Sequence, residues 1–154
     1  MKVATRKAAT EQNLTMSFVV DQWPEEVFDA VTNVRDWWTG EIKGKSAKVG
    51  DEFTFRYEDI HTSRQRVVEA VPGKRIVWLV TEANLTFADN PAEWVGTRIV
   101  FDIAKKGMKT ELRFTHEGLV PSCDCYGACN EGWTFYIEGS LRKLITAGKG
   151  ERVR

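Results

Sequence analysis

Residues 124–147 read DCYGACNEGWTFYIEGSLRKLITA, and this stretch decides the fold. Its large apolar side chains recur at spacings of three and four residues, which places them on one face of an α-helix. The members of this face are Trp133, Tyr136, Ile137, Leu141, Leu144 and Ile145. Ser122 and Asp124 are candidate N-caps, and Gly148 favours a helix end because glycine readily takes the left-handed conformation. The pattern therefore predicts one long amphipathic helix.

The chain before this helix alternates apolar and polar residues, which is typical of strands that bury one face. Alternation predicts strands over residues 14–20, 53–57, 61–71, 76–80, 93–104 and 112–116. Residues 83–92 carry turn signals and predict a loop. Pro24 favours the start of a short helix, and a second short helical segment is expected at Trp37 and Trp38.

Strands and helices are thus segregated along the chain, which predicts an α+β fold. A long helix with a wide aromatic face needs a concave surface to lie on. We therefore expect a curved antiparallel sheet of about six or seven strands wrapped around it. A chain of 154 residues suits one domain. The prediction is a flexible polar lead-in over residues 1–12, a single domain over residues 13–150 and a tail over residues 151–154.

Composition narrows the classes of partner. The 22 basic and 22 acidic residues cancel, so no positive field is expected to attract nucleic acid or an anionic membrane. No apolar run reaches the roughly 18 residues that a membrane-spanning helix needs. The three cysteines are an odd number in a sequence without a secretory signal, which indicates reduced thiols. We predict a cytoplasmic protein that neither binds nucleic acid nor inserts into a membrane.

Several short motifs together carry a family resemblance. They are PEEVFDAVT at residues 24–32, the Trp37-Trp38 pair, VGD at 49–51, VEAVPGKRI at 68–76 and THEGL at 115–119, followed by Gly132-Trp133 and SLRKL at 140–144. The chain resembles the helix-grip superfamily that includes Bet v 1-type proteins, START domains and polyketide cyclases. It looks most similar to the branch related to the C-terminal domain of the activator of Hsp90 ATPase.

This resemblance implies a helix-grip fold over residues 14–150, whereas members of the superfamily differ widely in ligand and chemistry. The activator also has a separate N-terminal domain that engages Hsp90, and this sequence has no room for one. That difference weakens the expectation of co-chaperone activity.

Small residues among large rings on the helix, such as Gly132 and Gly139, predict loose packing against the curved sheet. We expect a cavity there that binds a small hydrophobic or amphipathic ligand, either without catalysis or with a chemistry that the sequence does not identify. Its candidate lining residues are Trp37, Trp38, Phe53, Phe55, Tyr57, Trp78, Phe101, Phe114, His116, Trp133, Tyr136, Ile137 and Ser140. The alternative is that the same side chains fill a solid core.

Two other functions remain open. A cyclase- or hydrolase-type enzyme would use His116 or His61 with a carboxylate, and strand parity places Glu69 on the face of His61. A lone inward histidine is, however, more often a hydrogen-bonded structural group. A protein-binding module, in the manner of an Hsp90 co-chaperone, predicts an exposed apolar patch on the outer face of the sheet or around Trp94.

Cofactor and metal motifs are absent from the sequence. The spacing of Cys123, Cys125 and Cys129 lacks the two separated pairs typical of structural zinc sites. These residues suit small apolar packing, with redox reactivity as the alternative. No phosphate-binding loop or nucleophile elbow occurs. We expect no metal and no cofactor, and a small hydrophobic molecule as the partner. A protein partner is the alternative, and the sequence leaves monomer and homodimer open.

Overall fold

The computed structural model describes residues 11–38 and 40–150. Apart from residues 11 and 12, the predicted lead-in lies outside these ranges, and so does the predicted tail. Seven strands form one antiparallel sheet in the order β1-β7-β6-β5-β4-β3-β2. The strands are β1 (Leu14–Val20), β2 (Glu41–Gly44), β3 (Glu52–Tyr57), β4 (His61–Val71), β5 (Arg75–Leu85), β6 (Arg98–Lys106) and β7 (Lys109–Glu117).

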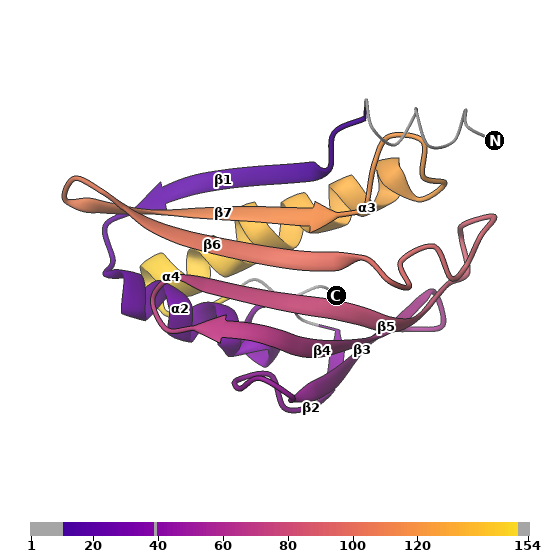
Figure 1. Ribbon diagram of the computed structural model, residues 1–154, viewed down its shortest axis with the longest axis horizontal. Coiled ribbons are helices and arrows are strands. Elements are labelled where there is room, and N and C mark those ends of the chain that lie inside the picture. The colour runs from indigo at the N-terminus through magenta and orange to yellow at the C-terminus, as the bar shows by residue number, and fades with distance from the viewer. Residues whose placement is uncertain (1–10, 39, 151–154) are drawn as a thin grey trace.

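Helices cover one face of this sheet (Figure 1). Between β1 and β2 lie α2 (Pro24–Thr32), as predicted from Pro24, and a short 3₁₀-helix (Val34–Asp36). The second helical segment was predicted at Trp37 and Trp38, but the 3₁₀-helix ends before them and Trp37 is its C-cap. The long C-terminal helix, orange to yellow in Figure 1, runs along the sheet with α2 beside its last turns. The α+β fold with a curved antiparallel sheet and a long C-terminal helix is therefore confirmed.

The long helix is not α-helical throughout. It consists of α3 (Tyr126–Trp133), a π-helical segment (Thr134–Leu141) and α4 (Arg142–Ala147). Its buried stripe has a strict four-residue spacing: Cys125, Cys129, Trp133, Ile137, Leu141 and Ile145. In an α-helix such a stripe would drift by about 40° per step, and the wider π turns in the middle oppose that drift. The π-helical segment was not predicted.

The two ends of this helix differ from each other in how well they were predicted. Gly148 ends it with φ +80°, as expected. The predicted N-caps are wrong, because Cys125 occupies the N-cap position and makes no side-chain capping bond. Instead, the Glu93 carboxylate accepts hydrogen bonds from the backbone N–H groups of Asp124 (2.7 Å) and Cys125 (3.1 Å).

The β5–β6 connection corrects two predicted boundaries. β5 continues to Leu85, where a loop was predicted, because His61, Thr62 and Ser63 of β4 pair with its last three residues. β6 begins at Arg98 rather than at residue 93. The residues between them form turns that bury Trp94.

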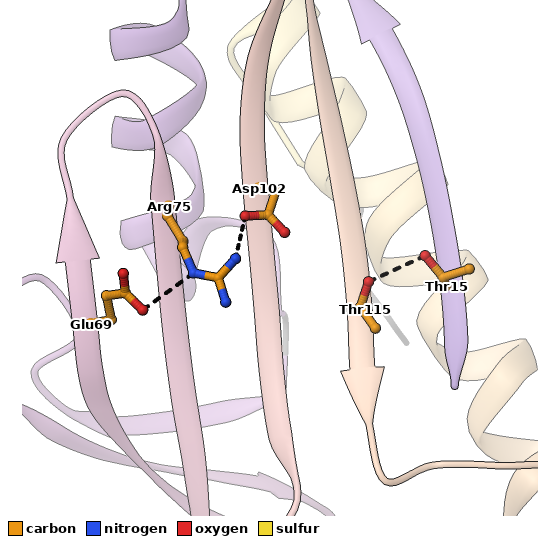
Figure 2. A network of polar contacts seen from close by, with 5 residues as sticks. All are labelled: Thr15, Glu69, Arg75, Asp102 and Thr115. Atoms are coloured by element: carbon orange, nitrogen blue, oxygen red, sulfur yellow. Dashed lines mark hydrogen bonds and ion pairs between the residues drawn. The ribbon is translucent and has the colours of Figure 1, made fainter. Parts of the chain in front are cut away.

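The prediction that Glu69 and His61 lie on the same face of the sheet is wrong, because β4 contains a β-bulge between them. The register with β5 shifts between Val67 and Glu69, so Glu69 does not share the face of His61. Glu69 instead lies on the outer face, where Arg75 donates to it at 3.2 Å and to Asp102 at 2.5 Å. Figure 2 shows this ion-pair network across three adjacent strands.

A threonine pair, Thr15 and Thr115, joins β1 to β7 at 3.3 Å in the same view (Figure 2). This part of the outer face is therefore polar. None of the helices within the described ranges combines the length and apolarity that crossing a bilayer requires.

Candidate functional site

A cavity of about 480 Å³ lies beneath the first half of the long helix. Phe55 and Tyr57 of β3 and His61 at the start of β4 form one wall, and Phe87 and Trp94 of the β5–β6 connection form another. The helix supplies a third wall through residues between Ala128 and Tyr136. The cavity thus lies at the end of the sheet where the chain turns between strands.

The predicted lining residues divide into two groups. Five of them line the cavity: Trp38, Phe55, Tyr57, Trp133 and Tyr136. Seven are buried in the core away from it: Trp37, Phe53, Trp78, Phe101, Phe114, Ile137 and Ser140. His116 lies directly behind the cavity wall, in contact with Trp94 and Trp133.

The core group closes the other end of the space under the helix. Trp37 and Trp78 of this group form a tryptophan cluster with Trp38 of the cavity lining, with ring centroids 5.9–6.2 Å apart and nearly parallel planes. Ser140 donates to the backbone carbonyl of Trp37 at 2.7 Å, so its hydroxyl binds the 3₁₀ segment to the helix. The cavity therefore occupies only the α3 end of the helix–sheet interface.

Sequence reasoning missed part of the lining. Phe87 was predicted in a loop and Trp94 in a strand, but both line the cavity. Phe135 lies off the predicted apolar face of the helix, and Cys129 was predicted to be a packing residue. Two aromatic residues within a polar connection were the available signal, because loops held by a rigid scaffold often carry binding residues.

The rim of the cavity is apolar and open to water. Ile60, Phe87 and Phe135 line it with exposed fractions of 40%, 46% and 36%. Within the part of the chain that the structure describes, Glu131 is the one acidic residue of the lining, and neither lysine nor arginine belongs to it. The site therefore presents aromatic surface with almost no fixed charge.

His116 belongs to a directed chain of hydrogen bonds behind the wall. The indole N–H of Trp133 donates to Nδ1 of His116 at 3.1 Å. The proton of the neutral ring is therefore on Nε2, which donates to Oγ1 of Thr97 at 2.8 Å. Thr97 in turn donates to the carbonyl of Trp94 at 2.6 Å. Both ring nitrogens are thus occupied.

Burial keeps both histidines neutral. It lowers the pKa of His116 to about 3, with a smaller contribution from the neighbouring His61. It lowers the pKa of His61 to about 4. Neither ring forms an ion pair with a carboxylate within the described residues, and Nε2 of His61 has no hydrogen-bond partner there.

The three cysteines are unpaired thiols at the start of the helix. Cys129 lines the cavity, and Cys125 is buried behind it. The hydrogen bond with Cys129, followed by burial, raises the pKa of the Cys125 thiol. Burial also raises the pKa of Cys123. Raised pKa values keep thiols protonated, which counts against redox reactivity.

A family model for Activator of Hsp90 ATPase homolog 1-like proteins (AHSA1) matches residues 21–146. The chain belongs to the AHSA1-like family. This match, and the fold around it, confirm the resemblance seen in the sequence. No curated protein matches the chain.

Solved structures agree with membership of the AHSA1-like family. The Aha1 dimer from Colwellia psychrerythraea is 27% identical with a TM-score of 0.72, covering 90% of this chain and 99% of that one. A protein from Chromobacterium violaceum is 20% identical with a TM-score of 0.65, covering 86% and 96%. A protein from Staphylococcus saprophyticus is 16% identical with a TM-score of 0.67, covering 93% and 98%. The last two show similarity of fold alone.

In this AHSA1-like chain, no group of three or more His, Cys, Asp or Glu side chains within residues 11–38 and 40–150 is arranged to hold a metal ion. Besides Glu131, the described lining residues with polar side-chain atoms are His61, Tyr57, Tyr136, Cys129 and the tryptophans Trp38, Trp94 and Trp133. Their chemistry suits hydrogen bonding to a ligand.

Proposed function

We propose that the protein binds a small apolar or amphipathic molecule in the cavity beneath α3. The supporting observation is an aromatic-walled hollow of about 480 Å³ whose rim leaves Ile60, Phe87 and Phe135 open to water. That volume falls in the range of small-molecule sites, and exposed apolar groups gathered around a hollow are typical of binding surfaces.

Catalysis is less well supported by the site. A general base needs a free nitrogen within reach of substrate, and both nitrogens of His116 are occupied behind the wall. His61 lines the cavity without a carboxylate partner in the described chain. These arrangements favour binding over acid–base chemistry.

A protein-binding role as an Hsp90 co-chaperone is also less well supported. It predicted an exposed apolar patch around Trp94 or on the outer face of the sheet. Trp94 is only 2% exposed, and the outer face carries the ion pairs of Arg75. Exposed apolar residues do lie in the same pocket as Trp94, namely Ile60, Phe87 and Phe135, but they surround a cavity, which favours a small ligand.

The experiment uses a glycine of the lining. A Cβ placed on Gly132 meets no heavy atom within 4 Å, so Gly132→Leu extends into open space beside the cavity without a clash at Cβ. Gly139 has equal room but does not line the cavity, so Gly139→Leu is the matched control. Lipids, sterols and aromatic metabolites are screened by thermal shift and by tryptophan fluorescence.

We expect at least one compound class to raise the Tm of the wild type and of Gly139→Leu but not of Gly132→Leu. The proposal fails if no compound shifts the wild type. It also fails if Gly132→Leu responds as strongly as the wild type, because the ligand would then bind elsewhere.

A further inference from the structure

We propose that the ligand is an uncharged, planar aromatic compound with a carbonyl oxygen, which accepts hydrogen bonds from the hydroxyls of Tyr57 and Tyr136. This inference rests on the proposed function, because it concerns the same cavity beneath α3. It adds the shape, the charge and the polar group of the molecule bound there.

The shape follows from the walls. Eight of the fourteen lining residues are Trp, Phe or Tyr, and rigid rings leave flat spaces between them. Trp94 and Trp133 lie with their planes 7° apart at a centroid distance of 5.8 Å. A planar aromatic molecule covers such ring edges and faces better than a flexible chain, which also loses more conformational entropy when it is ordered.

The ligand should be uncharged because the described lining has no cationic side chain that could pair with it. Among residues 11–38 and 40–150, no lysine or arginine lines the cavity, and His61 is neutral because burial lowers its pKa to about 4. A carboxylate or phosphate ligand would therefore be desolvated without a cationic partner, which is costly. The exposed Glu131 at the rim adds repulsion. Among the described lining residues, a cationic ligand would find a counter-charge at this rim alone, outside the aromatic interior.

The polar group follows from two tyrosine hydroxyls. Tyr57 reaches the cavity from β3 and Tyr136 from the helix, and both side chains are half-buried. Within the described residues neither hydroxyl forms a hydrogen bond, so both are available to a ligand. Burial, with a smaller effect of the nearby Tyr57, raises the pKa of Tyr136 to about 12, so its hydroxyl remains a donor at neutral pH.

A carbonyl oxygen suits this pair of donors. It has two lone pairs and can accept two hydrogen bonds. It also carries no charge that would need a counter-ion. Two other polar atoms of lining residues, Nε2 of His61 and Nε1 of Trp94, are buried without a partner in the described chain and out of contact with water. The tyrosines are therefore the groups that orient the ligand.

The test compares four probes that share a naphthalene ring and a substitution position. Acetylnaphthalene has a neutral carbonyl, ethylnaphthalene has no oxygen, naphthoate is an anion and naphthylmethylammonium is a cation. Isothermal titration calorimetry on the full chain measures each Kd. We expect acetylnaphthalene to bind about five- to tenfold more tightly than ethylnaphthalene, the advantage of typical hydrogen bonds. Both charged probes should bind more weakly than the ketone.

Phenylalanine variants separate hydrogen bonding from packing. Tyr57→Phe and Tyr136→Phe should each weaken acetylnaphthalene binding by about three- to tenfold and leave ethylnaphthalene unchanged. Tyr126→Phe is the matched control, because Tyr126 packs against the core on the same helix but does not line the cavity. It should leave both affinities unchanged.

The outcomes distinguish this inference from the proposed function. Tighter binding of naphthoate or of the cation, equal binding of the ketone and the hydrocarbon, or insensitivity to both Tyr→Phe changes would overturn the inference alone. If none of the four probes binds and the screened compounds also fail, the proposed function and this inference are both wrong.

Discussion

Trp133 and His116 are joined by a hydrogen bond of 3.1 Å that ties the long helix to the last strand of the sheet. Because the indole can only donate, it determines which nitrogen of the imidazole carries the proton. The second nitrogen then binds Thr97, whose hydroxyl holds the backbone of Trp94. One buried histidine therefore positions both stacked indoles of the cavity wall.

The first prediction concerns this histidine. His116→Phe keeps a ring of similar size but leaves the buried indole N–H of Trp133 without an acceptor. We expect the free energy of unfolding to fall by about 1–3 kcal/mol, measured by urea denaturation. Thr97→Val, which leaves the Trp133 bond intact, should cost less. An unchanged stability for His116→Phe would show that the chain of hydrogen bonds contributes little.

The second prediction is a pH dependence. The pKa of His61 is about 4 and that of His116 about 3 in the folded chain, against about 6.5 when unfolded. Between these values the unfolded chain binds more protons, so stability is full above pH ~6.5 and falls as the pH is lowered. Each histidine contributes a slope of about 1.4 kcal/mol per pH unit until its folded pKa is reached.

The variant His61→Phe isolates one of these two contributions. Urea unfolding of wild type and variant is compared from neutral pH down to pH ~4. As the pH falls, the free energy of unfolding of His61→Phe should rise relative to that of the wild type. The wild type loses stability because unfolding allows His61 to bind a proton, whereas the variant has no imidazole at this position. Parallel pH profiles would mean that His61 is not held neutral by burial.

The third prediction concerns the start of the long helix. Glu93 replaces the missing side-chain cap by accepting from the N–H groups of Asp124 and Cys125. Glu93→Ala should lower the free energy of unfolding by about 1–2 kcal/mol, because the N–H groups of the N-cap residue and of the residue before it lose this acceptor. Glu138→Ala, at an exposed position of the same helix, is the control and should change stability by less than about 0.5 kcal/mol.

Glu93 also illustrates which parts of the fold the sequence could and could not predict. Strands β1 and β4 match the predicted bounds because their apolar alternation is local, and the amphipathic helix was evident from Trp133 to Ile145. The path of the β5–β6 connection depends instead on contacts between Glu93 and the distant helix start. Without that path, neither Phe87 nor Trp94 could be assigned to the cavity.

The π-helical segment and the β4 bulge were missed for different reasons. The four-residue spacing from Cys125 to Ile145 was visible in the sequence and indicates turns wider than those of an α-helix. The bulge beside Val68 has a weak signal in the sequence, because the adjacent Val67 and Val68 interrupt the alternation just before Glu69. One inserted residue is enough to move Glu69 to the opposite face, so parity arguments fail beyond it.

The fourth prediction concerns Gln65 of β4. This residue is 0% exposed, and neither atom of its side-chain amide has a hydrogen-bond partner in the described chain. Burying an unpaired amide is unfavourable, whereas methionine has a similar length and no such group. Gln65→Met should therefore raise the free energy of unfolding by about 1–2 kcal/mol in urea denaturation. A loss of stability would show that the amide makes a favourable interaction in solution.

The tryptophan cluster has a spectroscopic consequence. Indoles as close as Trp37, Trp38 and Trp78 couple their electronic transitions, which should produce an exciton couplet in the circular dichroism spectrum. Such a signal depends on the mutual orientation of the rings and vanishes when they rotate independently. The chain therefore contains an internal, label-free reporter of whether its core is rigidly ordered.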